Sequence, residues 1–156
     1  YPSGSRDGAG ELFAGGRRWH FRHVQVGNPQ CTIRVVDEQE LKALDLPAIG
    51  PSIERNDLFP NRTNVSWYVP LAADRIRARI FERGVGETSA SGTGATGAAI
   101  GHVLEGGDSP VTVVLDGGEL EVEVAEGLHV TLTGWAVPVF RGTVSDEFVK
   151  ELDETE

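Results

Sequence analysis

The sequence contains no methionine and a single cysteine, Cys31. A lone cysteine excludes a disulfide scaffold and fits a reducing compartment, so we predict a cytoplasmic protein; Cys31 lies in an apolar run and is expected in the core. The N-terminus lacks signal-peptide features, and without an initiator methionine the chain is expected to be a fragment, a processed form or a trimmed chain. No hydrophobic run approaches the ~20 residues of a membrane span, so no membrane partner is predicted.

Positive charge is also scarce, with 14 Lys and Arg against 24 Asp and Glu and a net charge of −10. Nucleic-acid binding needs clustered cations, so nucleic acid is not a predicted partner. No spacing of His, Cys and carboxylate residues is typical of a metal site, so no metal is predicted. Residues 145–156 hold six carboxylates and one lysine and are predicted to form a solvated acidic helix or tail capped by Ser145.

The pattern of apolar and polar residues predicts a mixed α+β fold in one domain. A short helix is predicted from Glu38, with Asp37 as its cap. Residues 46–60 contain three prolines and are predicted to be mostly loop, and residues 1–20 are predicted to be loose. The expected strands are short runs bounded by Gly, Asn and Pro, at 22–26, 31–36, 63–69, 75–81, 111–115, 119–124, 129–134 and 135–144.

One further segment, residues 95–104, consists almost wholly of Ala, Gly, Ile, Val and Leu. A helix that is apolar on all sides must be buried, and Gly94, Gly97 and Gly101 would let strands approach its backbone. The sequence therefore predicts a curved, mostly antiparallel β-sheet of about eight strands wrapped around one central buried helix. The chain lacks the strand–helix alternation of a doubly wound parallel sheet.

The glycine-rich turn before this helix is the strongest candidate for a functional site. It follows a strand that ends at Glu82 and Arg83, and it contains Ser91 and Thr93. The first amides of a helix have no intrahelical acceptor, so this turn suits an anion. Arg83 beside it is either a carboxylate ligand or the partner of Glu82 in a surface ion pair.

Other interpretations of the region carry less weight. The run GTGATG (92–97) matches G-x-G-x-x-G, but the residues VGETSAS separate it from the strand end, so a nucleotide site is not predicted. Ser91 lacks the first glycine of the nucleophile elbow G-x-S-x-G, and helix capping by Ser91 or Thr93 is favoured. Asn28 and Asn64, near strand ends, are either turn residues or amides that bind a polar ligand.

Four motifs in order resemble the C-terminal half of diaminopimelate epimerase. They are GNPQ (27–30), FPNRTNV (59–65), ERGVGETSASGTGA (82–95) and LTGWAVPVFRG (132–142), the last being similar to the closing strand of that family. The resemblance covers residues 20–144. The third motif is highly specific, and the first two gain weight from their order and spacing around it.

The resemblance implies a fold of two similar lobes, each a sheet curled around a helix, with the active site between them. The family inverts an amino-acid α-carbon with two cysteines, one from each lobe, and needs neither pyridoxal phosphate nor metal, so no cofactor is expected. Residues 21–144 would form the C-terminal lobe. Residues 1–20 would be a loose segment or the remnant of the connection between lobes, and residues 145–156 an acidic tail.

The resemblance also implies roles for individual residues. Gly92 and Thr93 would give backbone amides to the α-carboxylate of the substrate. The amino group and the distal end of the substrate would be held by Asn28, Asn64, Glu82 and Arg83.

Two positions depart from the family. Gln30 stands where many members carry a histidine, and Ser91 stands where the second catalytic cysteine stands. A thiol has a pKa near ~8.5, whereas a serine hydroxyl is far less acidic and would need a strong local base. An engineered change, a natural variant with altered chemistry and a lineage without activity all fit Ser91.

These observations predict the C-terminal lobe of a diaminopimelate epimerase-like enzyme of lysine and cell-wall precursor synthesis, inactive as an isolated chain. Its expected partners are an amino acid with a second polar or carboxylate end, and either the missing N-terminal lobe or a second copy of the chain. The alternatives are a lobe of a PhzF-like or proline racemase-like isomerase, and a non-catalytic module that associates with itself.

Overall fold

The structure is a computed structural model that describes residues 8–153. Its strands are β1 (Ala9–Ala14), β2 (Arg17–Gln25), β3 (Pro29–Arg34), β4 (Asn64–Ala72), β5 (Arg75–Glu82), β6 (Gly86–Thr88), β7 (Val111–Leu115), β8 (Gly118–Val124) and β9 (Val130–Thr133). Its helices are α1 (Glu38–Ala43), α2 (Leu46–Glu54), α3 (Gly92–Leu104) and α4 (Asp146–Asp153), with a 3₁₀ turn at Glu126–Leu128.

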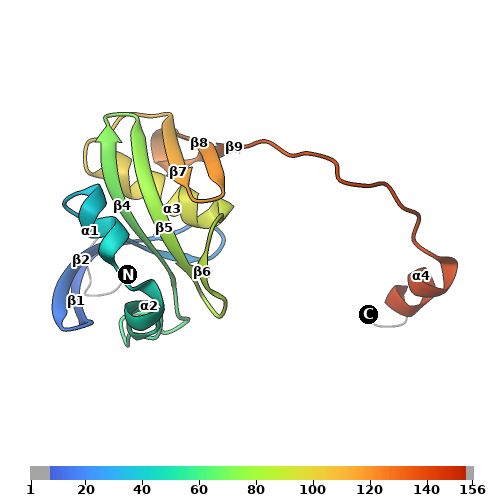
Figure 1. The fold of residues 1–156 in the computed structure, drawn as a ribbon, viewed down its shortest axis with the longest axis horizontal. Coiled ribbons are helices and arrows are strands. Elements are labelled where there is room, and N and C mark those ends of the chain that lie inside the picture. Colours follow the sequence, from blue (N-terminus) through green and yellow to red (C-terminus); the bar gives the residue numbers. More distant parts are fainter. Residues whose placement is uncertain (1–7, 154–156) are drawn as a thin grey trace.

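All nine strands belong to one sheet (Figure 1). Their order is β1-β2-β3-β4-β5-β7-β8-β9, and β6 pairs with β5. The β3–β4 and β5–β7 pairs are parallel, and the other pairs are antiparallel. The predicted α+β fold with a mostly antiparallel sheet is confirmed.

Helix α3 is buried along most of its length, as its composition predicts. Residues 94–102 are all buried, and the helix contacts β2, β3, β4, β5, β7, β8 and β9. The three glycines permit this close approach. A Cβ atom would lie 2.7 Å from Ile80 Cδ1 at Gly94, 2.8 Å from Gln30 Cβ at Gly97 and 2.5 Å from Thr32 Oγ1 at Gly101, all too close for a side chain.

A second apolar core lies on the opposite face of the sheet, under α1 and α2. Strand β4 divides its side chains between the two cores, with Val65, Trp67 and Val69 on the α1/α2 side and Tyr68 on the α3 side. Residues 64–69 of this strand are therefore buried on both faces. The prediction of a single central helix accounts for the core around α3. It does not account for the second core under α1 and α2.

The prediction that residues 1–20 are loose is wrong for residues 9–20, and residues 1–7 lie outside the described part of the chain. Strand β1 forms an antiparallel hairpin with β2. Leu12 and Ala14 alternate inward and are buried, and the turn is made by Gly15 and Gly16, which both have positive φ. The segment is rich in glycine and other small residues, so its short alternating strand was not recognised in the sequence.

The prediction of a loop over residues 46–60 is wrong for residues 46–54, which form α2. Asp45 caps this helix by accepting a hydrogen bond from the Ala48 amide at 3.1 Å. Pro47 stands in the first turn, where no amide hydrogen is needed. Burial of Leu46 and Ile53 then stabilises the helix despite Pro51 in its interior.

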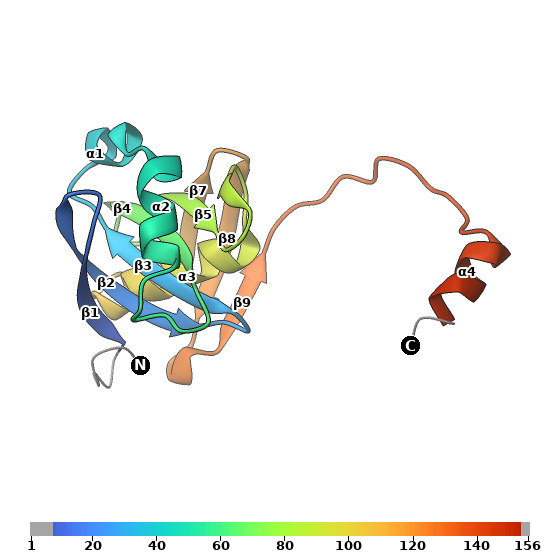
Figure 2. The same ribbon diagram turned by 90° about the horizontal axis from the view of Figure 1, so that it is seen from below.

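The chain after β9 extends away from the sheet and carries α4 at its far end (Figures 1 and 2). Residues 134–145 have no regular secondary structure, so the predicted strand over 135–144 is wrong: its side chains are exposed and no described strand pairs with it. The acidic helix is confirmed, and Ser145 Oγ accepts a hydrogen bond from the Phe148 amide at 3.3 Å. None of the helices between residues 8 and 153 is long and apolar enough to cross a membrane.

Candidate functional site

The N-terminus of α3 reaches the protein surface beside the end of β5. Ser91 is 9% exposed and caps the helix, with its Oγ atom accepting a hydrogen bond from the Gly94 amide at 3.2 Å. Gly92 is half-buried and Thr93 is exposed, and their amides have no acceptor within the helix. The predicted cap is confirmed, and these amides remain available to an anion.

A hollow of about 500 Å³ opens at this helix end. Among the residues that line it, Glu82 supplies the ionisable side chain, and its Oε1 atom accepts a hydrogen bond from Thr88 Oγ1 at 3.1 Å. The lining residues are Val26, Glu82, Ser91, Gly92, Thr93, Thr96, Val130 and Leu132. No histidine of the described chain lines this hollow, so the structure offers Ser91 no histidine base of the hydrolase type.

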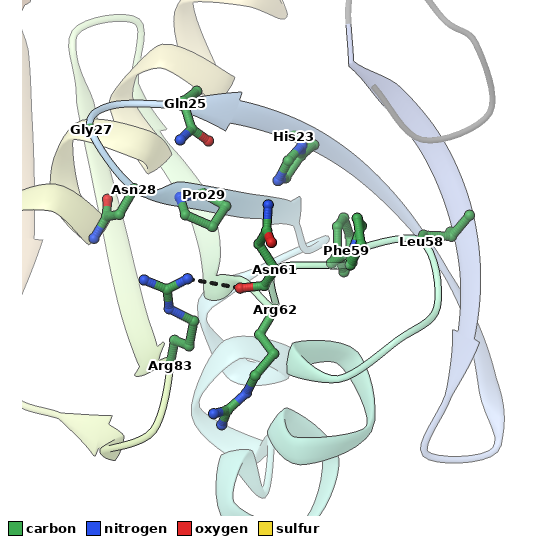
Figure 3. Close-up of a pocket in the computed structure, with 11 residues that line it drawn as sticks. His23, Gln25, Gly27, Asn28, Pro29, Leu58, Phe59, Asn61, Arg62 and Arg83 are labelled. Carbon is green, nitrogen blue, oxygen red and sulfur yellow. Dashed lines mark hydrogen bonds between the residues drawn. The ribbon is translucent and has the colours of Figure 1, made fainter.

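A larger hollow of about 730 Å³ lies next to it, between the β2–β3 turn and the loop that precedes β4 (Figure 3). Arg83 reaches its rim and donates from Nη1 to the backbone oxygen of Asn61 at 2.7 Å. Within the described part of the chain Arg83 forms no ion pair, so the proposed surface pair with Glu82 is absent. The hollow is lined by His23, Gln25, Gly27, Asn28, Pro29, Leu58, Phe59, Pro60, Asn61, Arg62 and Arg83.

Asn28 joins the two hollows. Its Nδ2 atom donates to Thr93 Oγ1 at 3.4 Å, across 65 residues of sequence. Its Oδ1 atom accepts from Nε2 of Gln30 at 2.7 Å. Gln30 is fully buried at 0% exposure, and its Oε1 atom has no hydrogen-bond partner. Gln30 therefore holds Asn28 from inside the core.

Asn64 is buried behind the larger hollow and lines neither hollow. Its Oδ1 atom accepts a hydrogen bond from the Arg83 amide at 2.7 Å, and its Nδ2 atom donates to the backbone oxygen of Pro29 at 3.4 Å. The structure thus joins Asn64 to the backbone of one other predicted residue, Arg83, and to the backbone of Pro29, which was not predicted. In this arrangement Asn64 acts on the position of Arg83.

Cys31 is confirmed as a core residue. It lies in β3 with no exposed surface, and burial raises the pKa of its thiol. His23 lines the larger hollow, and partial burial lowers the pKa of its imidazole. Among residues 8–153 no group of three or more His, Cys, Asp and Glu side chains is arranged to hold a metal ion.

Sequence reasoning missed three contributions to the site. Asn61 and Arg62 belong to the motif FPNRTNV, from which it selected only Asn64. Val130 and Leu132 line the smaller hollow from β9, and apolar alternation alone gives no signal for this role. Glu54, at the end of α2, was missed together with its helix.

The family model for diaminopimelate epimerase matches residues 22–139. The chain belongs to the diaminopimelate epimerase family. Curated relatives include the diaminopimelate epimerases of Synechococcus sp. (strain JA-2-3B'a(2-13)), 42% identical over 86% of this chain and 48% of the relative, and of Pelotomaculum thermopropionicum, 43% identical over 84% of this chain and 46% of the relative. The diaminopimelate epimerase of Magnetococcus marinus is 41% identical over 84% of this chain and 46% of its own length. The chain spans about half the length of the curated relatives it matches.

Two solved structures are also similar to this member of the family. A putative phenazine biosynthesis PhzC/PhzF protein from Clostridium difficile has a TM-score of 0.41 and 16% identity, over 64% of this chain and 35% of that chain. A PhzF-family phenazine biosynthesis protein from Bacillus anthracis has a TM-score of 0.43 and 17% identity, over 80% of this chain and 38% of that chain.

Proposed function

We propose that this chain is the C-terminal lobe of a cofactor-independent epimerase that inverts an α-carbon of a dicarboxylic amino acid of the diaminopimelate type. The observation that carries the proposal is the hollow at the start of α3, where the unpaired amides of Gly92 and Thr93 lie beside the carboxylate of Glu82. In such a hollow the amides can bind a carboxylate, and the carboxylate of Glu82 beside them can bind an ammonium group. These are the two charged groups that every amino acid carries on its α-carbon. Lysine and cell-wall precursor synthesis in the cytoplasm is the corresponding proposed role.

The chemistry follows from what each group can stabilise. Removal of the α-proton leaves negative charge on the α-carbon and its carboxylate, and the amides of Gly92 and Thr93 stabilise that charge. Glu82 pairs with the α-ammonium group. Arg83, which forms no ion pair with any residue between 8 and 153, binds the distal carboxylate from the larger hollow. Asn28 lines the larger hollow and contacts Thr93 of the smaller one, so it lies between the proposed sites of the two carboxylates.

The coverage of the relatives supports the assignment as one lobe. The alignments to the curated relatives cover about half of those proteins. The chain after β9 also leaves apolar side chains without cover, with Trp135 at 71% and Phe140 at 86% exposure. Apolar surface of this kind marks an interaction site, and a preceding lobe would cover it.

Ser91 makes the isolated chain inactive in this proposal. Epimerisation needs one group that takes the α-proton and a second that returns a proton to the opposite face. The Ser91 hydroxyl is a poor base, although it can donate a proton, and the opposite group would come from the other lobe. The chain alone therefore binds the amino acid without exchanging its α-proton.

The test combines ligand binding with proton exchange. Calorimetric titration with meso-diaminopimelate should show binding to the full chain that Arg83→Ala abolishes and Arg18→Ala, which removes an exposed arginine outside both hollows, leaves intact. NMR in deuterated water should show no loss of the α-proton signal. Exchange by the isolated chain would refute its inactivity, and the absence of any binding would refute the substrate class.

A one-base isomerase is a second candidate, favoured by Ser91. A lobe with a hydroxyl donor and no thiolate suits a one-base isomerase such as a PhzF-like enzyme, in which an acidic residue of the missing lobe moves a proton within the substrate. A proline racemase-like lobe is the other alternative of this class, and the loss of the cysteine weakens its two-base chemistry. The upstream coding sequence distinguishes the candidates. A cysteine facing Ser91 favours an altered epimerase, and a carboxylate there favours the isomerase.

A non-catalytic module is a third candidate, favoured by the exposed apolar residues of β9 and the segment after it, namely Val130, Leu132, Trp135, Val137, Val139 and Phe140. Two copies would cover this surface in a two-fold arrangement. Sedimentation equilibrium at high protein concentration would then show a dimer, and a monomer would remove this candidate.

A further inference from the structure

A buried carboxylate lies behind Arg83 and forms no part of either hollow. Glu54, the last residue of α2, is 2% exposed. It pairs with the guanidinium of Arg62 and accepts a hydrogen bond from the Gly84 amide at 2.8 Å. A third, longer ion pair joins Oε2 of Glu54 to Nε of Arg55 at 3.9 Å. A buried carboxylate is costly unless its oxygens are paired, so these contacts keep Glu54 in place.

Two of the partners of Glu54, Arg62 and Gly84, belong to the two segments that carry Arg83 and its hydrogen-bond acceptor. Arg62 has a left-handed backbone with φ of 59° and directly follows Asn61, whose oxygen accepts from Arg83. Gly84 directly follows Arg83 and has φ of 80°. Glu54 therefore connects the segment that carries Arg83 with the segment that carries its acceptor, Asn61.

Packing of α2 holds Glu54 at this point. A Cβ atom at Gly50 would lie 2.5 Å from Cδ2 of Phe81, so only glycine lets the helix approach β5 this closely. In Figure 3 the Arg62 side chain points toward α2, whereas the Arg83 guanidinium lies at the hollow beside Asn61. Arg62 thus pairs with Glu54, whereas Arg83 binds the backbone oxygen of Asn61 at the hollow.

The two arginines also differ in their ion pairing. Arg62 neutralises Glu54, and Arg83 has no carboxylate partner in the described part of the chain. A guanidinium held by one backbone carbonyl and left without a counter-ion suits a carboxylate of a ligand. The position of Glu54 also prevents Arg62 from offering its charge to that ligand.

We propose that Glu54 is a positioning residue that aims the Arg83 guanidinium over the larger hollow and so sets the preference for a ligand with a distal carboxylate. The ligand part of this inference rests on the proposed function. L-Lysine is the matched probe, because it is diaminopimelate without the distal carboxylate. Loss of the Glu54 charge leaves Arg62 unpaired and releases the Asn61 carbonyl from its place beside Arg83.

The experiment compares Glu54→Gln with wild type by calorimetric titration of the full chain with meso-diaminopimelate and L-lysine. Glu54→Gln should weaken diaminopimelate binding about tenfold, because a buried charged partner is removed, and should leave lysine binding almost unchanged. Glu119→Gln, which breaks the Arg75–Glu119 pair on the sheet, is the matched control and should change neither. Equal weakening for both probes, or none, would overturn the proposal.

A second measurement separates this inference from the proposed function. Amide hydrogen exchange by NMR in the ligand-free chain should be faster in Glu54→Gln at both Arg83 and Gly84, and unchanged in Glu119→Gln. Should wild type bind neither probe, the substrate class fails, and the exchange result alone decides whether Glu54 positions Arg83. Unchanged exchange at Arg83 would then overturn the positioning role.

Discussion

Gln30 donates a hydrogen bond from its side-chain amide to Oδ1 of Asn28 at 2.7 Å, which connects the buried core to the rim of both hollows. Asn28 in turn donates to Thr93 at the start of α3. A residue with no exposed surface thus determines how the Asn28 amide, which lines the larger hollow, is oriented. In the proposed function, Gln30 acts on the substrate only through Asn28.

Replacement of Gln30 by leucine should disorder Asn28 with little change in global stability. The loss of one hydrogen bond costs about 1 kcal/mol, but leucine also removes the unpaired buried Oε1 atom, which offsets a similar amount. We expect the side-chain amide signals of Asn28 to shift and broaden in NMR spectra. Gln25→Leu, the same change at an exposed position, is the control, and sharp unshifted Asn28 signals in Gln30→Leu would contradict the prediction.

Alanine at Gly101 should destabilise the protein even though alanine favours helices. The new Cβ atom would lie 2.5 Å from Thr32 Oγ1 and 3.2 Å from Thr32 Cβ. Overpacking of a rigid core costs about 1–3 kcal/mol, which exceeds the gain of about 1 kcal/mol in helix propensity.

Denaturant unfolding of Gly101→Ala measures the net change in the free energy of unfolding. The control is Gly142→Ala, where the nearest side-chain atom is 3.7 Å from the new Cβ. A Gly101→Ala protein as stable as wild type would show that β3 can move away from α3, contrary to the packing described here.

The central helix and its cap were predictable because their signal is local. A run of small apolar residues has one stable location, inside the sheet, and Ser91 stands directly before its first turn. The glycines at 94, 97 and 101 lie on the helix at positions where strands contact it, as their spacing suggests. For the same reason the start of α3, the proposed anion site, could be located from the sequence.

The relation between the two hollows could not be predicted from local patterns. The Asn28–Thr93 contact joins residues 65 positions apart, and it depends on the packing of α3 against β3. Residues 46–54 looked like a loop because proline disfavours helices, yet Pro47 is tolerated in a first turn. The missed helix carries Glu54, so its ion pair with Arg62 was missed too.

Cys31 should be unreactive in the folded protein. Its thiol is fully buried, and burial raises its pKa because the thiolate loses hydration. Iodoacetamide at mildly alkaline pH should leave the native chain unmodified by mass spectrometry and alkylate it once in concentrated guanidinium chloride. Rapid labelling of the native chain would show that β3 opens or that the thiol reaches solvent.

Loss of the Ser91 cap should destabilise α3. Ser91→Ala removes the acceptor of the Gly94 amide, and we expect a loss of about 1 kcal/mol in the free energy of unfolding. Ser145→Ala removes the equivalent cap of α4, an exposed helix beyond the sheet, and should leave the main unfolding transition unchanged. Equal effects of the two substitutions would show that Ser91 contributes no more than a surface cap.

Cysteine at position 91 should be unusually acidic if the start of α3 stabilises negative charge. The Gly94 amide, 3.2 Å from Ser91 Oγ, would donate to a thiolate there, and the unpaired amides of the first turn add to this stabilisation. Since the position opens on a hollow of about 500 Å³, these effects should outweigh partial burial. The thiol pKa in Ser91→Cys is then expected below the ~8.5 of a free cysteine.

The rate of alkylation as a function of pH measures this thiol pKa, because buried Cys31 contributes no signal in the folded chain. Ser89→Cys is the matched control: it is exposed, lies two positions earlier and stands outside α3, so its thiol should titrate near ~8.5. A lower value for Ser91→Cys would mean that the helix end is already arranged to stabilise an anion and that the serine at position 91 alone withholds the thiolate. Identical values would remove the electrostatic basis of the proposed carboxylate site.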